Sequence, residues 1–471
     1  MLGIDGLSVV TVLHLIIAVP LCGHVLLRKD QEPVAVGWIA LILLSPFVGS
    51  ALYGLFGINR LERKARKLRG QADIAAGKIA TLSASVDRTK TDPRILRIAV
   101  SVTDLPFVAG NSVEPLVNGD QAYPAMLAAI ANAKESIALS TYIFDSDATG
   151  QNFVTALSQA VQRGVAVYVL VDDVGLHYSP RAIDRDLVAG GVKVARFIPP
   201  TLRFLRFFNL RNHRKILVAD GEVGFIGGMN IRHGNMIAAA TRHPVQDIHF
   251  RVRGPVLDQL SALFEEDWHF ATGTEIELPQ WAQDTPAPAA SAARLVPDGP
   301  DHRSETLQWL LLGALAVSQR CIRIMTPYFI PNGQLVSALA IAAMRGVDVE
   351  ILIPEKTNIP FVGWAMAANF ERLMTHGVKI YLNPPPFDHS KLMVVDGNWV
   401  LVGSTNWDQR SLRLNFEANL ECHDASLADA LEKYFDRKKA CSKAVSLAAV
   451  QAAPLWIRLR NNFVRLFGPY L

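Results

Sequence analysis

The sequence is poor in cysteine and lacks a metal-binding pattern. Four cysteines occur in 471 residues, without the CxxC or CxxH spacing of a zinc site: Cys22, Cys321, Cys422 and Cys441. We therefore expect no disulfide framework, and a reducing compartment suits the chain. Clusters of carboxylate or histidine ligands are also missing, so we expect chemistry that needs neither a metal ion nor another cofactor.

The chain also has no large excess of charge of one sign. The chain has 47 Lys and Arg against 43 Asp and Glu, a formal net charge of +4, which gives no strong signal for a polyanion. We expect no nucleic-acid partner. A mean hydropathy of +0.21 is high for a purely soluble protein. At about 150 residues per domain, the length allows roughly three units.

Two N-terminal stretches contain no Asp, Glu, Lys or Arg: residues 6–27 and 33–59. Each is long enough for a hydrocarbon core, which needs about 20 residues. We predict two membrane helices over residues 1–59, kinked at Pro20 and Pro46. A cleaved signal peptide and a pair of buried core helices are the alternatives, although a signal peptide favours a basic start that this chain lacks.

Basic residues follow the second apolar stretch, within residues 60–110, which we expect to be a juxtamembrane linker. This segment begins with six basic residues: Arg60, Arg63, Lys64, Arg66, Lys67 and Arg69. The short loop between the apolar stretches has only two, Arg28 and Lys29. This imbalance predicts that both ends lie in the cytoplasm. The cluster suits an anionic phospholipid membrane, or alternatively forms a solvated linker helix.

One short pattern occurs twice, 176 positions apart. Each copy contains His-x-Lys, an apolar run, Asp-Gly, a second apolar run and a turn that ends in Asn, 17 positions after the histidine. The first copy runs from His213 through Lys215 and Asp220 to Asn230; the second runs from His389 through Lys391 and Asp396 to Ser404 and Asn406. Agreement at this many positions indicates a site in two parts.

Alternation places the His and Lys of each copy on one face of a strand, and Asp-Gly then predicts a hairpin turn. Imidazole is a nucleophile or acid–base group near neutral pH, and lysine and amide groups donate to anionic oxygens. Two such half-sites facing each other would hold a phosphate between two histidines. The pattern therefore favours phosphodiester chemistry.

These residues resemble the phospholipase D superfamily, which is marked by a paired His-x-Lys-x4-Asp motif followed by Gly-Ser-x-Asn. The second copy matches fully, whereas the first has Gly228 in place of the hydroxyl residue. Features along nearly the whole chain resemble bacterial cardiolipin synthases. The resemblance implies a catalytic set in the two motifs and a phosphate-binding set: His213, Lys215, Asp220, His389, Lys391 and Asp396, with Asn230, Ser404 and Asn406.

The resemblance also implies that His213 is the nucleophile and His389 the acid–base group, a choice on which the symmetric motifs are silent. Relatives have an acidic partner for the histidine where this chain has Glu417, and Asp247 is its counterpart in the first half. We expect these two carboxylates to orient the histidines. We assign Asp220 and Asp396 to orientation and hairpin architecture.

Further repeats lie outside the motif, such as residues 163–171 against 345–353, and helical stretches end at Gly before β-branched runs. We predict an α/β fold, with two pseudo-twofold-related phospholipase D-type domains that have mixed sheets flanked by helices. The domains should span residues 111–280 and 301–445. A Pro/Ala-rich linker at 281–300 should join them, with the site on the seam.

Two segments mix basic and large apolar residues: residues 202–211, just before the first motif, and the C-terminal segment 446–471. Both suit a membrane interface, or alternatively pack on the domain core. A nuclease with the same motif would need neither segment and would favour a wider basic groove.

The resemblance implies a cardiolipin synthase of the bacterial inner membrane, multi-pass, with its catalytic domains on the cytoplasmic side. It would join two phosphatidylglycerol molecules through a phosphohistidine and release glycerol. Alternatives are a hydrolytic phospholipase D, a synthase with phosphatidylethanolamine as donor, and a membrane scaffold with a degenerate site. Oligomeric state and acyl preference are not readable from the sequence.

Overall fold

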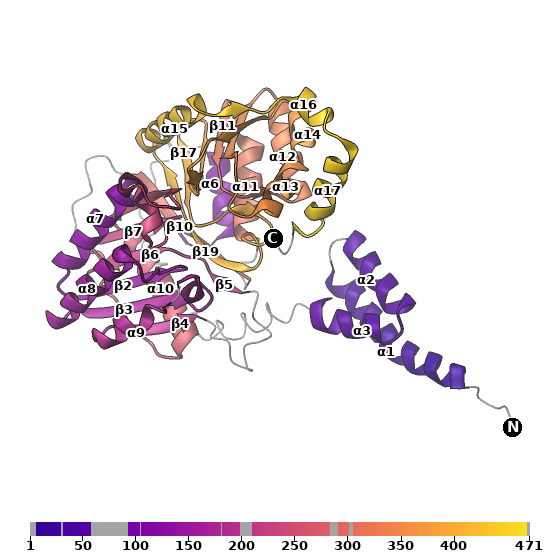
Figure 1. Ribbon diagram of the computed structural model, residues 1–471, viewed down its shortest axis with the longest axis horizontal. Coiled ribbons are helices and arrows are strands. Elements are labelled where there is room, and N and C mark those ends of the chain that lie inside the picture. The colour runs from indigo at the N-terminus through magenta and orange to yellow at the C-terminus, as the bar shows by residue number, and fades with distance from the viewer. Residues whose placement is uncertain are drawn as a thin grey trace. The chain divides into compact units, whose positions relative to one another are not determined.

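The computed structural model describes residues 6–29, 32–57, 93–103, 105–179, 181–197, 210–282, 291–300 and 305–468 (Figure 1). It divides into an N-terminal unit, Met1–Lys67, and a main unit, Leu68–Leu471. The predicted basic cluster at residues 60–69 and most of the basic–aromatic run, residues 202–209, lie outside the described residues.

The N-terminal unit contains one helix that is long and apolar enough to cross a membrane, Val9–Arg28 within α1 (Gly6–Arg28). The prediction of a second such helix was wrong. Residues 32–57 divide into three short helices: α2 (Glu32–Leu44), α3 (Val48–Leu52) and η1 (Tyr53–Gly57). The break falls at Pro46, which has no N–H to donate and whose ring clashes with the preceding turn. Pro20 is accommodated inside α1.

The main unit is built on one continuous mixed sheet. Its path in space is β20 (Lys443–Ala444), β14 (Lys379–Asn383), β13 (Asp348–Pro354), β11 (Cys321–Met325), β16 (Leu392–Val395), β17 (Trp399–Gly403), β19 (Asn415–His423), β10 (Ser291–Asp298), β1 (Val108–Val117), β9 (Ile248–Arg253), β7 (Val223–Gly227), β6 (Ile216–Ala219), β2 (Ser136–Thr141), β3 (Ala166–Asp172) and β4 (Lys193–Phe197). From the central β10–β1 pair outward to β14 and β4, equivalent strands follow in the same order, which confirms the predicted duplication.

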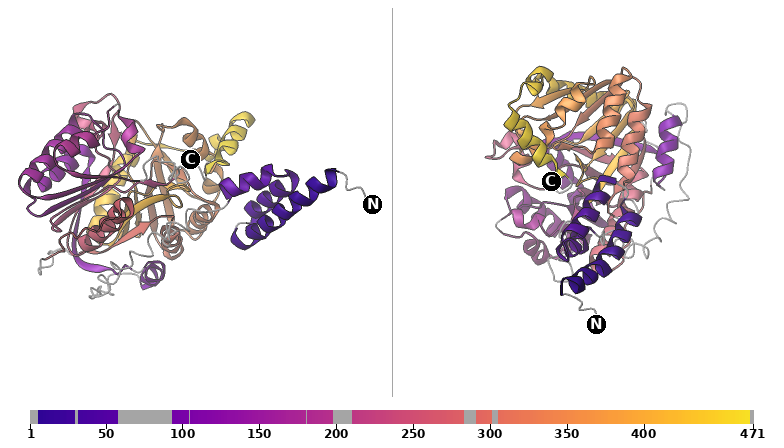
Figure 2. Two further views of the ribbon diagram at one scale, coloured as in Figure 1. Left: turned by 90° about the horizontal axis from the view of Figure 1, so that it is seen from below. Right: turned by 90° about the vertical axis from the view of Figure 1, so that its right-hand side faces the viewer.

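The two halves are joined more closely than the predicted domains and linker imply. Strand β10 lies where the linker was expected and pairs with β19 along its length and with β1 at Val108↔Ala293. The linker prediction was therefore wrong for residues 291–298. Strand β10 was not predicted because its segment is rich in Pro and Ala. It is buried between β19 and β1, so the sheet continues from one half into the other (Figure 2).

Helices pack on both faces of this sheet. On one face, α10 (Val256–Thr272) and α15 (Ala425–Ala440) cover a single apolar core that draws strands from both halves. On the other face the halves have separate cores. These cores lie under α7 (Asn118–Asn132), α8 (Ala148–Gln162) and α9 (Asp184–Ala189) in the first half, and under α11 (Thr306–Val317), α12 (Gly333–Met344), α13 (Pro360–Ala367) and α14 (Phe370–Met374) in the second.

Apart from three short strands described below, the remaining elements are short helices and two short strands. They are α6 (Pro93–Val102), η3 (Gly175–Tyr178), η5 (His233–Asn235), η6 (Ile237–Ala239), β12 (Phe329–Ile330), β18 (Trp407–Asp408), α16 (Leu447–Gln451) and α17 (Leu455–Arg465). The last two form the predicted C-terminal segment, and α17 packs on α13.

Two further short strands cross between the halves, each just before a motif histidine. Strand β5 (Arg211–Asn212) pairs with β19, and β15 (Phe387–Asp388) pairs with β8 (Val245–Gln246). The backbone N–H of His213 then donates to Phe416 O at 2.9 Å, and that of His389 to Gln246 O at 2.7 Å. Each histidine is therefore fixed to the opposite half of the molecule.

Each motif folds as the predicted hairpin, β6–β7 or β16–β17, with Asp-Gly at the turn. Asp220 and Asp396 have φ of 54° and 53°, and the glycines that follow have φ of 64° and 67°. Both turn residues thus occupy the left-handed region, as a type I′ turn requires.

The aspartates bind backbone at these turns. The Asp220 carboxylate accepts N–H groups from Lys134, Glu135 and Ser136 at 2.7–2.8 Å. Asp396 accepts those of Gln319, Arg320 and Cys321 at 2.6–3.0 Å. Although the resemblance places both aspartates in the catalytic set, the geometry gives them an architectural role.

We predict that Asp220→Ala lowers the free energy of unfolding by about 1–3 kcal/mol, because it removes the acceptor of three N–H groups and places alanine at a positive φ. Asp220→Asn should cost less, since it keeps an acceptor and tolerates that φ. The denaturant midpoint of the detergent-solubilised protein checks this. A fall in turnover with an unchanged midpoint would instead assign Asp220 to the chemistry.

Candidate active site

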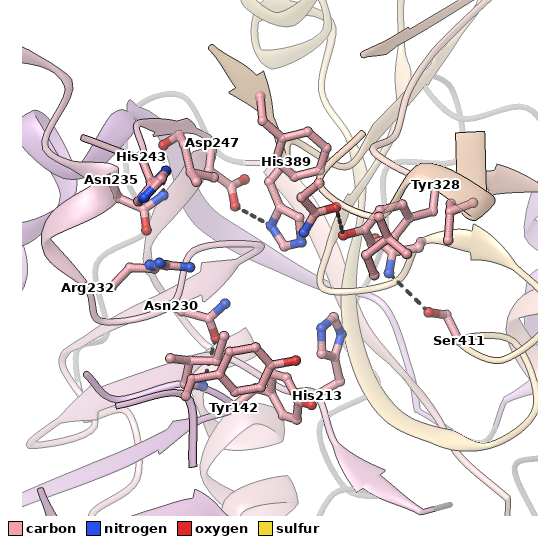
Figure 3. Close-up of a pocket in the computed structure, with 18 of the residues that line it drawn as sticks. Tyr142, His213, Asn230, Arg232, Asn235, His243, Asp247, Tyr328, His389 and Ser411 are labelled. Atoms are coloured by element: carbon pink, nitrogen blue, oxygen red, sulfur yellow. Dashed lines mark hydrogen bonds and ion pairs between the residues drawn. The ribbon is translucent and has the colours of Figure 1, made fainter. Parts of the chain in front are cut away.

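The two motif hairpins bring their histidines to a shared pocket of about 840 Å³ that both halves line. Figure 3 shows His213 and His389 pointing into the space between the halves, with Tyr142 and Asn230 on one wall and Tyr328 on the other. The sequence prediction of a composite site on the seam agrees with this arrangement.

Each histidine is held by a carboxylate from the opposite half. His213 Nδ1 lies 3.0 Å from both Glu417 Oε1 and Oε2, and His389 Nδ1 lies 2.8 Å from Asp247 Oδ2. Both carboxylates were expected as partners, but the motifs did not reveal that the pairs cross. When Nδ1–H donates to the acid, Nε2 keeps its lone pair for chemistry.

The motif lysines lie beside their histidines, as strand alternation predicts. Lys215 Nζ donates to His213 O at 2.6 Å, and Lys391 Nζ donates to His389 O at 2.5 Å. Both side chains are buried, and this burial lowers the pKa of Lys215 to about 7 and that of Lys391 to about 8. Each lysine is therefore readily returned to its charged form by an anion.

Burial also drives the other titratable groups toward their neutral forms. It lowers the pKa of His213 and His389 well below 6.5, and the two lysines lower it further. Burial raises the pKa of Asp247 and of Glu417 to about 7. A neutral imidazole near pH 7 is the form that a nucleophile requires.

The two motif asparagines line the pocket, as predicted. Asn230 Oδ1 accepts the N–H of Ile143 at 3.0 Å, which leaves its amide N–H groups to face the pocket. Asn406 Nδ2 donates to Ser411 Oγ at 3.2 Å. Each asparagine can also donate to a phosphate oxygen, because a carboxamide nitrogen carries two N–H bonds.

Ser404 does not have the predicted phosphate-binding position. Its hydroxyl is fully buried and absent from the pocket lining. It donates to Glu417 Oε2 at 2.5 Å and accepts the N–H of Ala418 at 3.0 Å. The prediction is corrected because Ser404 lies behind the carboxylate and holds it in place.

Gly228 occupies the equivalent place in the first half, where the carboxylate belongs to the shorter Asp247. A Cβ on Gly228 would lie 2.7 Å from Asp247 Oδ1 and 2.9 Å from Oδ2. The departure of the first motif from Gly-Ser-x-Asn is therefore coupled to its acid. One half uses glycine with aspartate, and the other uses serine with glutamate.

Several pocket residues were not anticipated as site residues. Tyr142 and Tyr328 contact His213 and His389 edge-on, with ring centroids 5.2 and 6.3 Å apart. Both tyrosines lie in the repeated Thr-x-x-Phe stretches (Thr141–Phe144 and Thr326–Phe329), so the duplication contained a signal for them. The basic residues of the lining had no such signal: Arg211, Arg232, Arg242, His243 and Arg410.

Among the described residues, no group of three or more His, Cys, Asp and Glu side chains is placed to hold a metal ion. The donors beside the two imidazoles are the amides of Asn230 and Asn406, which line the pocket, and the ammonium groups of Lys215 and Lys391, which are buried and do not contribute to its lining. This arrangement can stabilise a pentavalent phosphorus transition state while one histidine attacks and the other transfers a proton.

We predict that a tetrahedral anion binds this pocket with proton uptake. At pH 8 the free protein has Lys215 largely and Lys391 half deprotonated, since their pKa values are about 7 and 8. A nearby anion raises both, so binding should take up on the order of one proton.

Calorimetry with sulfate, which does not titrate in this range, in buffers of different ionisation enthalpy measures the uptake. Lys215→Met should bind sulfate more weakly and take up fewer protons. Binding enthalpies that do not depend on the buffer at pH 8 would contradict the prediction.

Comparisons with known proteins agree with this geometry. A family model described as cardiolipin synthase, PLD-like domain, matches residues 126–268 and 311–439. A cardiolipin synthase of Geobacillus kaustophilus (strain HTA426) is 31% identical over 454 residues, which cover 94% of this chain and 90% of the relative. The major cardiolipin synthase of Bacillus subtilis (strain 168) is 30% identical, covering 99% of this chain and 98% of the relative.

A solved structure shares the fold of the main unit. Phosphatidylserine synthase from Haemophilus influenzae Rd KW20 has a TM-score of 0.64 and 16% identity, covering 80% of this chain and 100% of that one. At this identity the similarity shows a common architecture alone.

Proposed function

Because the chain belongs to the PLD-like cardiolipin synthase family, we propose that it is a phosphatidyltransferase that joins two phosphatidylglycerol molecules into cardiolipin and releases glycerol. The observation that supports this most directly is the pair of histidines, each held by a buried carboxylate of the opposite half. Such a pair can perform a two-step transfer without a further group.

In the first step, Nε2 of one histidine attacks the phosphorus of the donor lipid, and the bond from phosphorus to the glycerol headgroup breaks. The negative charge of the bound phosphodiester would raise the pKa of the other histidine, which in its protonated form gives its proton to the leaving glycerol oxygen. The products are free glycerol and a phosphatidyl group on the attacking imidazole. The carboxylate at Nδ1 stabilises the positive charge that this ring acquires.

In the second step, the now neutral acid–base histidine accepts the proton of a headgroup hydroxyl of a second phosphatidylglycerol. The hydroxyl oxygen attacks phosphorus and the phosphorus–nitrogen bond breaks. This forms cardiolipin and returns the first histidine to its free state with both protons accounted for. Water at the same position would give phosphatidic acid instead.

We assign the attacking role to His213. Its carboxylate, Glu417, accepts hydrogen bonds from Ser404 at 2.5 Å and from Asn415 at 3.3 Å, and these fix its orientation. For Asp247, the partner of His389, the structure gives one backbone donor instead, Ile248 N at 2.8 Å. The better supported carboxylate suits the ring that must bear a positive charge through the lifetime of the covalent intermediate.

Asn230 and Asn406 would donate to the non-bridging oxygens of the reacting phosphate, and Lys215 and Lys391, buried beside the histidines, would supply positive charge close to them. Their donors are placed before the reaction, so little reorganisation is needed as charge develops. Burial makes these interactions stronger than they would be in water.

Cationic groups beyond the lysines support a second anionic lipid as the acceptor. Arg232 and Arg242 line the first-half wall of the pocket, and Figure 3 shows Arg232 on the wall that bears Asn230 and Asp247. The lysine pair already matches one phosphodiester. The remaining cations suit the phosphate of an incoming phosphatidylglycerol and would favour it over water or a neutral alcohol.

The enzyme is proposed to be anchored in the bacterial inner membrane by the N-terminal unit. Helix α1 can span the bilayer, and α2 packs against it through an apolar cluster that includes Ala18, Val25, Ala35 and Ile42. In a multi-pass arrangement, the three short helices from α2 to η1 would carry the chain back across the bilayer. The basic residues after residue 59 favour a cytoplasmic catalytic unit and contact with anionic headgroups.

We predict that His213→Ala and His389→Ala each lower cardiolipin formation by about 10³-fold or more, because each removes one of two interdependent catalytic groups. Purified protein in phosphatidylglycerol liposomes, scored by mass spectrometry for cardiolipin and glycerol, provides the measurement. His376→Ala is the matched control, since His376 is exposed and outside the pocket.

Other outcomes of that assay identify the alternatives. Phosphatidic acid as the sole product would assign a hydrolase, and ethanolamine release from mixed liposomes would assign phosphatidylethanolamine as donor. A protein without turnover would be a scaffold. Near-normal activity in either histidine variant would contradict the composite site.

Arg232→Ala should shift product from cardiolipin toward phosphatidic acid and raise the apparent KM for the acceptor by about tenfold, the effect of one charge-assisted hydrogen bond. Arg232→Lys, which keeps the charge, should lose less. Arg251→Ala, a surface arginine paired with Glu114, controls for general effects. An unchanged ratio of the two products would remove Arg232 from acceptor binding.

A further inference from the structure

Helix α17 packs on the rest of the main unit with its less apolar side. Asn461 is buried, Ile457 is half-buried, and the half-buried Val464 packs against the core of the second half. The opposite side presents six large apolar side chains, 47–70% exposed: Leu455, Trp456, Leu459, Phe463, Leu466 and Phe467. At 100° per residue these six form one continuous stripe, in which Leu466 and Phe467 continue the last turn just beyond Arg465. A soluble surface helix has the reverse orientation.

Helix α13, which packs beside α17, extends this stripe. Phe361 is 45% exposed and Trp364 is 37% exposed, whereas Val362, Ala365 and Met366 on the other side of α13 are buried. The Arg460 guanidinium lies over the ring of Trp364, with its Cζ 4.3 Å from the centroid, and 5.5 Å from that of Trp456. We call the eight exposed apolar side chains of the two helices the α13–α17 face.

The charges on helix α17 have one sign. Helix α17 contains Arg458, Arg460 and Arg465 and no acidic residue, and none follows Asp436 in the sequence. Arg458 lies 3.7 Å from Glu371, at the edge of the face. Exposed aromatic and aliphatic side chains flanked by arginine are the pattern of helices that lie in the interface of an anionic bilayer.

The face is also continuous with the pocket. Val362 of α13 and the neighbouring Ile359 line the pocket, while Phe361 and Trp364 of the same helix belong to the face. Beyond α17, a Cβ on Gly468 would lie 3.4 Å from Ile330, another pocket residue. A lipid seated at the face would therefore have its headgroup beside the pocket entrance.

We propose that the α13–α17 face is a membrane-docking surface, which inserts its apolar side chains among the lipids of an anionic bilayer and presents the pocket to their headgroups. It supplements the N-terminal anchor, because tethering alone does not orient the pocket toward lipid. The proposal rests on the proposed function only in taking a phospholipid as substrate.

A kinetic experiment separates docking from catalysis. In the full-length protein, Leu459→Asp/Phe463→Asp should lower kcat/KM on phosphatidylglycerol vesicles by roughly tenfold or more, because two apolar insertions are lost. Activity on short-chain phosphatidylglycerol below its critical micelle concentration should stay within about twofold. Gln159→Asp, which adds a charge at an exposed position of α8 away from this face, is the matched control.

Equal losses on vesicles and on the monomeric lipid would overturn the proposal and assign the face to folding or to the pocket itself. Unchanged kcat/KM on vesicles would overturn it as well. If the wild-type protein makes no cardiolipin from either substrate, the proposed function fails, whereas the position of the face is tested independently by labelling.

For labelling, a thiol-reactive fluorophore is placed at Leu459→Cys or, as control, at Asp429→Cys on α15, which is exposed. The background is Cys22→Ala, Cys321→Ala and Cys441→Ser, which leaves the buried Cys422. In phosphatidylglycerol vesicles, brominated lipid should quench only the label at 459, and aqueous iodide should quench the label at 429 more strongly.

Equal iodide quenching at the two positions would overturn docking. A change of oligomeric state in the Leu459→Asp/Phe463→Asp variant, without lipid quenching at 459, would also overturn it and assign the face to a second copy of the chain.

Discussion

The crossed hydrogen bonds between each motif histidine and the carboxylate of the opposite half are the interaction on which the rest of the site depends. They require the halves to meet in one register. The short pairings β5 with β19 and β15 with β8 set that register from the backbone. The continuous sheet through β10 and β1 and the core shared under α10 and α15 then hold the halves at a fixed separation. The architecture therefore serves to align two ring nitrogens.

Burial of this cluster determines its electrostatics. Ammonium groups and carboxylates that would be charged in water are driven toward neutrality, the imidazoles are held neutral, and an entering phosphodiester would restore charge to the lysines. The halves are not electrostatically equal, because Glu417 is fixed by Ser404 whereas Asp247 lies against Gly228. A twofold arrangement of groups thus has two different environments, which is what a reaction with separate nucleophilic and proton-transfer roles needs.

Local rules predicted much of this arrangement from the sequence. Strand alternation placed His213 and Lys215 together, Asp-Gly predicted the hairpin turn, and the repeated segments predicted matching halves. These features depend on residues a few positions apart. The pattern also identified both carboxylates through the family resemblance.

The crossing could not be predicted in the same way, because it depends on strands of two residues, and the histidine–carboxylate pairs that they align are 204 and 142 positions apart in the sequence. The position of Ser404 depends on which way a hydroxyl points inside the core. The break at Pro46 was missed because the apolar composition around it favoured one long helix. Strand β10 was missed because its Pro/Ala-rich surroundings favoured a linker, and periodicity does not resolve either case.

The crossed pairing also has a consequence for synthesis of the chain on the ribosome. When the first half has emerged, His213 is present but its carboxylate is not, because Glu417 lies on β19, the last long strand of the sheet in the sequence. Asp247 is synthesised before its partner, His389. Neither half can therefore form its own histidine–acid pair: the pair of His389 requires synthesis as far as residue 389, and the pair of His213 requires synthesis as far as residue 417.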